Sequence, residues 1–135
     1  MAHLKARLVA KGFAQKEGVD YEETFSPIEK WATVRTLFPL AAQNSWKVHQ
    51  MDVKTAFLNG DLKENVFMSQ PEGFAVKGHE HKVCKLVKSL YGLKQAPRAW
   101  YEKLTEHLLK LNFKHYDLDD ATLFEVGKKV VYFLV

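Results

Sequence analysis

Apolar and polar residues alternate in short stretches, and the spacing changes from that of a strand to that of a helix. Residues 5–11 alternate with a period of two, which places Lys5, Arg7 and Lys11 on one face of a predicted strand. Residues 33–44 carry apolar side chains at helical spacing, and a proline within this helix predicts a kink or an early end. A second strand, predicted over 46–52, ends in a carboxylate.

The remainder of the chain predicts a helix flanked by pairs of short strands. Two strands are expected over 66–69 and 83–87, and Pro97 fits the first turn of a helix, where its missing N–H is not needed. Two further strands are expected over 122–126 and 130–135, joined by a turn that contains glycine. The last of these runs to the final residue, which predicts a domain interrupted within a core strand. Without repeats or a linker, we expect one α+β domain over residues 1–135.

Composition excludes several classes of protein. The 135 residues are 47% hydrophobic and 27% charged, as in an ordinary soluble globular domain. The single cysteine, Cys84, cannot form an internal disulfide. No apolar run reaches the roughly 18 residues that a membrane-spanning helix requires, and the first residues do not resemble a signal peptide.

Basic residues are concentrated in two stretches that contain no acid, 3–11 and 82–98. The formal net charge of +4 permits a polyanionic partner but does not establish one. The two stretches could form one positive face that binds nucleic acid, or they could be ordinary solvated surface. Both interpretations stay open at this level.

Asp52 is the first candidate for chemistry. A carboxylate at the end of a buried strand can hold a divalent cation, because Mg²⁺ prefers oxygen ligands and takes only one or two of them from the protein. Asp52 could instead cap a short helix over 54–58 by accepting hydrogen bonds from its free N–H groups. The spacing alone favours the cap.

The stretch 89–97 has the composition of a binding loop. Gly92 permits close approach of another backbone, Tyr91 offers a flat ring, and Lys94 and Arg98 bring positive charge to the start of a helix. The alternative is a plain loop leading into that helix with a solvated basic edge. Chemistry alone favours the plain loop.

Two further motifs are weaker. His79-x-His81-x-x-Cys84 offers three possible zinc ligands, but no second cluster completes a four-ligand site. The stretch 116–120 resembles Tyr-x-Asp-Asp but has one residue too many before the aspartate pair. It also follows a helix in a polar segment, so we predict a turn and not a catalytic hairpin.

Five segments in order resemble the reverse transcriptase of copia-type long-terminal-repeat retrotransposons, and together they extend along most of the chain. They are KARLVAKGF (5–13), YEETFSP (21–27), TVRTL (33–37), HQMDVKTAFLNG (49–60) and KSLYGLKQAP (88–97).

The resemblance implies an incomplete right-hand polymerase fold, with fingers and the front of the palm. The family palm sheet would place 130–135 beside 46–52. Asp52 matches the first of three catalytic aspartates, and the Val53 carbonyl is an expected metal ligand. We expect the sequence to end one residue before the Tyr-x-Asp-Asp that bears the other two aspartates, with no thumb or RNase H domain.

The resemblance also assigns binding residues. Phe57 matches the aromatic gate that excludes a ribose 2′-OH. The fingers strand is expected to contact the triphosphate of the nucleotide through Lys5, Arg7 and Lys11. The loop beside the nucleotide and template contributes Tyr91, Gly92 and Lys94. The nucleic acid itself is expected to contact Lys94 and Arg98.

The implied reaction is attack of a primer 3′-OH on the α-phosphate of a dNTP, directed by an RNA or DNA template. Two Mg²⁺ ions stabilise the attacking and leaving oxygens. The resemblance implies a protein that acts inside the cell, in a cytoplasmic particle or the nucleus, and does not bind a membrane. With one matched aspartate, we expect this chain alone to be inactive. A non-catalytic nucleic-acid-binding remnant and an inert translated transposon fragment are the alternatives, and the oligomeric state is not predicted.

Overall fold

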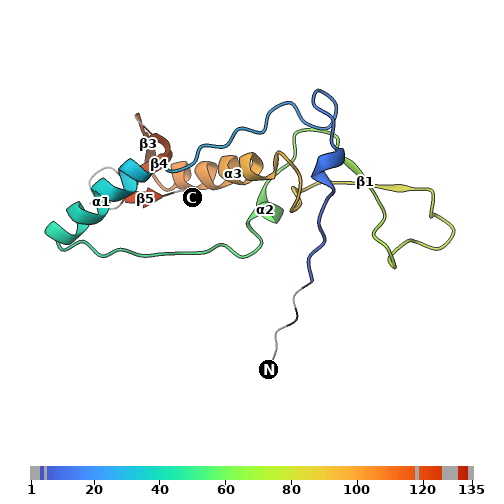
Figure 1. Cartoon of the computed structure of the whole chain (residues 1–135), viewed down its shortest axis with the longest axis horizontal. Coiled ribbons are helices and arrows are strands. Elements are labelled where there is room, and N and C mark those ends of the chain that lie inside the picture. Colours follow the sequence, from blue (N-terminus) through green and yellow to red (C-terminus); the bar gives the residue numbers. More distant parts are fainter. Residues whose placement is uncertain (1–3, 5, 118, 126–130, 134–135) are drawn as a thin grey trace. The chain divides into compact units, whose positions relative to one another are not determined.

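A computed structural model of the chain divides into two compact units, and most of its elements are labelled in Figure 1. The structure describes residues 4, 6–117, 119–125 and 131–133. Unit 1 comprises Met1–Phe25 and Thr55–Trp100, and unit 2 comprises Ser26–Lys54 and Tyr101–Val135. Each unit has its own hydrophobic core.

Unit 1 is built largely from loops that converge on a small core. It contains the 3-10 helix η1 (Gly12–Ala14), the short helix α2 (Ala56–Asn59) and the antiparallel strands β1 (Phe67–Ser69) and β2 (Val83–Lys85). The first turns of α3 (Ala96–Lys110) also belong to it. Its core consists of four buried residues, Val66, Leu90, Leu93 and Ala96. Burial of these apolar side chains is the main term that stabilises the unit.

Gly60 lets the α2 loop lie directly against the start of α3. A Cβ on this residue would lie 2.9 Å from the Ala99 Cβ, so only glycine fits without movement. The Gly60 carbonyl accepts a hydrogen bond of 2.9 Å from the Ser89 backbone N–H, and Asp61 forms an ion pair with Lys88. These contacts join the loop after α2 to the segment that leads into α3.

Unit 2 contains the helix α1 (Trp31–Gln43) and a three-stranded antiparallel sheet. The sheet order is β3 (Phe113–Tyr116), β4 (Asp119–Glu125) and β5 (Val131–Phe133). Leu123 on the central strand has no exposed surface and packs with Leu108 of α3 and Phe113 of β3. No described helix is long and apolar enough to cross a membrane.

Several predicted elements are confirmed. The mixture of helices and antiparallel strands agrees with the α+β class. Helices were expected over 33–44 and from Pro97, and both are present. Of the kink or early end predicted at Pro39, the early end is wrong, because α1 continues to Gln43 and the Asn44 N–H donates to the Leu40 carbonyl at 3.0 Å.

Two predicted strands are absent. Residues 46–52 have no regular secondary structure, and the same holds for 6–11, the described part of the strand expected over 5–11. The expected pairing with 46–52 is also wrong for 131–133, since β5 pairs with β4 and 46–52 contains no strand, while 130, 134 and 135 lie outside the described residues. An alternating pattern needs a neighbouring strand with free backbone groups, and neither segment has one among the described residues.

The segment 116–120 is part of a β-hairpin, not a polar link after a helix. β3 was not predicted, and it pairs with β4 so that Tyr116 lies opposite Asp119, with a register shift after His115. The turn itself was predicted at this position. The strand was missed because only Phe113 of its four residues is buried, and one buried residue produces no periodic signal.

Two buried carboxyl groups connect β4 to the region around the start of α1. Asp119, 4% exposed, accepts a hydrogen bond of 2.6 Å from the Thr33 hydroxyl. The hydroxyl of Thr122 lies 3.1 Å from both carboxyl oxygens of Glu29, which is 8% exposed. Burial, and then the negative charge of Asp119, raise the pKa of Glu29. Burial also acts to raise the pKa of Asp119, but hydrogen bonds from Thr33 and backbone N–H groups outweigh it and lower that pKa.

Replacing Glu29 should make unfolding less dependent on pH. Because its pKa is raised in the folded state, its contribution is complete below the ordinary value of 4.5 and is lost as pH rises through the folded pKa. Glu29→Gln keeps an acceptor for Thr122 but cannot ionise, so its stability relative to wild type should be greater at about pH 8 than at about pH 5. Urea unfolding at the two pH values measures this, with the exposed Glu17→Gln as control. Parallel pH profiles for wild type and Glu29→Gln would refute the assignment.

Candidate nucleotide and nucleic-acid site

In unit 1, the loop before α3 contacts the N-terminal segment through its backbone. The Ala10 N–H donates a hydrogen bond of 2.8 Å to the Tyr91 carbonyl. Gly92 has φ +95°, and a Cβ there would lie 2.3 Å from the Ala10 carbonyl oxygen. A Cβ on Gly12 would lie 2.0 Å from the Gly92 oxygen, so both glycines are required. The close backbone approach expected of Gly92 is therefore made to the protein's own N-terminal segment.

An aromatic pair lies beside this contact. The rings of Phe57 and Tyr91 have centroids 5.4 Å apart and planes inclined at 37°. Tyr91 remains 53% exposed, so part of its ring is available to a ligand. Thr55, just before α2, has φ +56°, an uncommon conformation for a β-branched residue. Strained backbone of this kind concentrates at functional sites, and here it precedes Phe57 by two residues.

The predicted cations have different surroundings. Arg7 and Lys11 are exposed. Lys11 comes directly after Ala10, whose N–H donates to the Tyr91 carbonyl. Lys5 lies outside the described residues. Lys94 donates a hydrogen bond of 3.0 Å to the Tyr21 hydroxyl, and its Nζ lies 4.8 Å from that ring's centroid. Its charge is therefore held in place by a cation–π contact.

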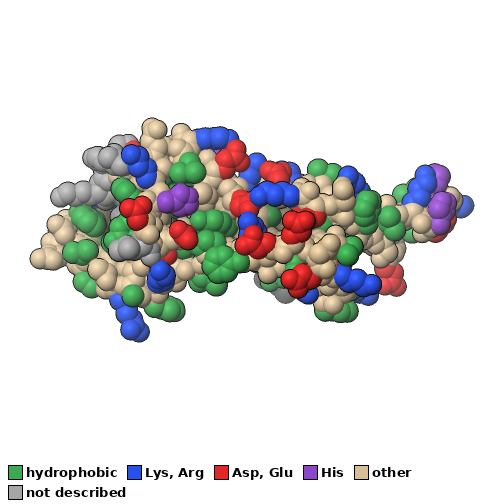
Figure 2. All heavy atoms as spheres, turned by 90° about the horizontal axis from the view of Figure 1, so that it is seen from above, with side chains coloured by type: hydrophobic (Ala, Val, Ile, Leu, Met, Phe, Trp, Pro, Cys, Tyr) green, Lys and Arg blue, Asp and Glu red, His purple; other side chains and the backbone are tan. Residues whose placement is uncertain are grey.

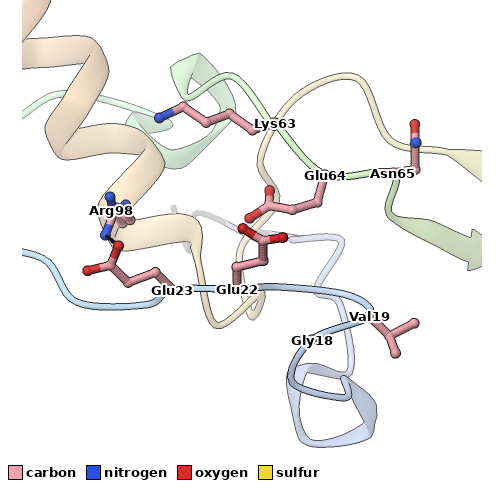
Figure 3. A pocket seen from close by; sticks show the side chains of 8 residues that line it. All are labelled: Gly18, Val19, Glu22, Glu23, Lys63, Glu64, Asn65 and Arg98. Atoms are coloured by element: carbon pink, nitrogen blue, oxygen red, sulfur yellow. Dashed lines mark ion pairs between the residues drawn. The ribbon is translucent and has the colours of Figure 1, made fainter.

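Arg98 forms an ion pair with Glu23 at 2.5 Å, beside an open pocket of unit 1 drawn in Figure 3. The side chains of Glu22 and Glu64 point toward each other there, while Lys63, on the same segment as Glu64, extends away from the two carboxylates. Three carboxylates in one pocket disfavour a phosphate. Arg98 would have to leave Glu23 to contact nucleic acid.

The face drawn in Figure 2 carries charges of both signs. Figure 2 shows Lys and Arg side chains interspersed with Asp and Glu side chains on the face that it draws. No broad basic surface is seen on this face, so we consider the residues around Ala10 and Tyr91 as a local candidate site for a polyanion.

Asp52 and Val53 belong to unit 2 and are exposed in the irregular segment before α2. The prediction that Asp52 caps a helix over 54–58 is wrong, because α2 begins at Ala56 and its N-cap residue is Thr55. Within the described part of the chain, no group of three or more His, Cys, Asp or Glu side chains could hold a metal ion. A carboxylate oxygen and a carbonyl oxygen are nevertheless donors of the type that Mg²⁺ takes.

The histidine motif lies on the long loop between β1 and β2. The rings of His79 and His81 meet edge to face with centroids 6.3 Å apart, while Cys84 lies on β2 opposite Met68. The loop is organised by Gln70, whose amide nitrogen donates to the His79 carbonyl at 2.7 Å and the Lys82 carbonyl at 2.9 Å. These bonds explain an ordered loop without any metal.

Sequence reasoning missed three residues that join the N-terminal segment to the loop before α3: Gln15, Tyr21 and Gln95. Gln95 was noted only as one letter of a motif, yet it is 3% exposed. The burial of this glutamine cannot be predicted from its neighbours in sequence, because its hydrogen-bond partners are about 75 to 80 residues away in the chain.

The family model for reverse transcriptase (RNA-dependent DNA polymerase) matches residues 1–131, and the chain belongs to this family. Its relatives include copia-type retrotransposon Pol polyproteins of plants. It is 60% identical over 103 residues (76% of the chain) to the Pol polyprotein of transposon TNT 1-94 from Nicotiana tabacum. It is 51% identical over 133 residues (97% of the chain) to that of transposon RE1 from Arabidopsis thaliana.

More distant relatives come from yeast. The chain is 34% identical over 111 residues, 78% of its length, to the transposon Ty1-H Gag-Pol polyprotein of Saccharomyces cerevisiae. It spans 8% and 9% of the two plant polyproteins and 6% of the yeast one. No solved structure matches the chain. The chain therefore corresponds to part of the reverse transcriptase region of a retrotransposon Pol polyprotein.

Proposed function

We propose that the chain forms the fingers and front palm of an RNA-directed DNA polymerase, with a nucleotide site in unit 1. The observation that carries this proposal is the contact between the segment around Ala10 and the Tyr91 loop. Ala10 donates a hydrogen bond to the Tyr91 carbonyl, and the next residue in sequence is the exposed Lys11. The ring of Tyr91 pairs with that of Phe57. Positive charge beside a half-exposed aromatic ring suits the phosphates and the base or sugar of a nucleotide.

Each residue has a distinct role in this proposal. Arg7 and Lys11, with Lys5, attract the triphosphate of a dNTP, and Phe57 excludes a ribose 2′-OH. Tyr91 and Gly92 line the nucleotide and template, whereas Lys94 and Arg98 contact the nucleic-acid backbone. The ring of Tyr21 holds the charge of Lys94, and Glu23 competes with phosphate for Arg98.

Asp52 and the Val53 carbonyl are the proposed protein ligands of a divalent cation, for which Mg²⁺ fits the oxygen donors. When bound, such an ion neutralises charge on the triphosphate. Both residues are exposed. Within this chain, Asp52 would supply a negative charge to that cation.

Nucleic-acid binding by the 135-residue chain tests the proposal. If Arg7, Lys11 and Lys94 each neutralise a phosphate, the logarithm of the affinity should fall with the logarithm of salt concentration with a slope of about −2.7 on duplex DNA. Arg7→Glu with Lys11→Glu should remove about two phosphate contacts and flatten the slope to about −1. Fluorescence anisotropy of a labelled primer–template at several salt concentrations measures this.

The matched control is Lys77→Glu with Lys82→Glu, which changes the net charge equally. Both lysines are exposed on the loop between β1 and β2. This pair should weaken binding slightly and leave the slope nearly unchanged. Equal losses of affinity and slope in the two double variants would show that only net charge matters, and the site assignment would be abandoned.

A further inference from the structure

The N-terminal segment is joined to the Tyr91 loop by a network of side chains centred on Gln95. The Gln95 amide nitrogen donates to the Asp20 carbonyl at 2.9 Å, and its oxygen accepts from the Gln15 amide nitrogen at 2.9 Å. The Gln15 oxygen in turn accepts from the Lys94 backbone N–H at 2.8 Å. Two glutamine side chains thus bridge residues 15–20 and 94–95, and each of the two amide groups both donates and accepts.

The same two segments are also joined at both ends of this network. At one end, Ala10 bonds the Tyr91 carbonyl, and at the other, Lys94 bonds the Tyr21 hydroxyl. Gln95 is the buried member between them, with 3% of its surface exposed. If the two segments moved apart, the buried amide of Gln95 and its partners would lose their hydrogen bonds without water to replace them. The network therefore favours a single relative position of the two segments.

We infer that Gln95 is a positioning residue of the nucleotide site, which acts with Gln15 to fix the basic N-terminal segment against the loop that carries Tyr91 and Lys94. This inference rests on the proposed function and adds a residue pair to it. Neither glutamine contacts the ligand in this scheme. They determine where Arg7 and Lys11 stand relative to the Phe57–Tyr91 pair.

Gln95→Glu is the sharpest test, because it keeps the shape of the side chain and replaces the donor by a carboxylate. The carboxylate would face the Asp20 carbonyl oxygen, so the two segments should separate. Binding of dTTP with Mg²⁺ to the 135-residue chain, measured by calorimetry, should weaken about fivefold or more. Exchange of the Ala10 amide hydrogen should become faster in the same variant.

A control separates positioning from general loss of stability. Leu86→Ala removes a side chain that packs on the same core but takes no part in the glutamine network. At a temperature where both variants are folded, Leu86→Ala should bind dTTP as wild type does. Equal weakening in the two variants would mean that Gln95 is only structural, and the inference would be overturned.

The outcomes also distinguish the inference from the proposal on which it depends. If wild type binds dTTP and Gln95→Glu binds it equally well, the positioning role is wrong and the nucleotide site stands. If wild type does not bind dTTP, the proposed site is wrong and the positioning role falls with it. A Gln15→Ala, Gln95→Ala double variant should bind no more weakly than the worse single variant, because both act through one network.

Discussion

Gly92→Ala is expected to destabilise unit 1 by about 2–5 kcal/mol, because the added methyl group meets both backbone strain and a close neighbour. Gly92 has φ +95°, where an L side chain is strained. The added Cβ would also lie 2.3 Å from the Ala10 oxygen and 2.7 Å from the Val9 Cγ1. Both neighbours belong to the segment that bonds the Tyr91 carbonyl, so the contact at the site must open.

Gly78→Ala is the matched control for this effect. Gly78 has a similar φ of +80°, but a Cβ there would have no atom within 4 Å. Its substitution should cost only the backbone strain, about 1 kcal/mol. Urea unfolding followed by the fluorescence of Trp100, with Trp31 and Trp46 replaced by Phe, reports on unit 1. Equal destabilisation by the two substitutions would show that Ala10 and Gly92 are not in close contact.

Helices were predicted well because their signal is local. α1 and α3 follow from the spacing of apolar side chains and from a proline in the first turn of α3. Pro39 did not end α1, although it cannot donate a backbone hydrogen bond to the Arg35 carbonyl. The cost of about one lost bond is evidently smaller than the gain from extending the helix to Gln43.

Strands were predicted less well because a strand needs a partner that its own residues do not specify. The alternation in 5–11 and 46–52 indicated strands that the described residues do not contain. β3 was missed although it pairs along its length with β4. Local patterns record which side chains prefer burial, whereas pairing depends on the position of another segment.

The contacts made by the predicted site residues could not be read from the sequence. Gly92 was expected to allow a close approach, and the structure shows that the approaching group is Ala10. Lys94 and Arg98 were predicted to be available cations, but Tyr21 and Glu23 engage them. These partners lie within a segment rich in acids and aromatics, whose sequence alone indicates only a solvated surface.

Asp52→Asn should have the largest effect on activity. In a polymerase that contains this chain together with the Tyr-x-Asp-Asp of its family, the substitution should lower the rate of DNA synthesis about 10³-fold or more. Asparagine keeps the size of the side chain but removes the negative charge that the proposal assigns to a divalent cation. The 135-residue chain without those aspartates should not extend a primer at all.

The most direct test of the proposed polymerase function is template-directed incorporation of dNTP by that polymerase, compared between Asp52→Asn and Asp117→Asn. Asp117 is an exposed aspartate at the β3–β4 turn, so it controls for the loss of one negative charge. The proposal predicts that Asp117→Asn retains wild-type incorporation while Asp52→Asn loses it. Incorporation that survives Asp52→Asn unchanged would contradict the assignment of Asp52 and with it the proposed catalytic site.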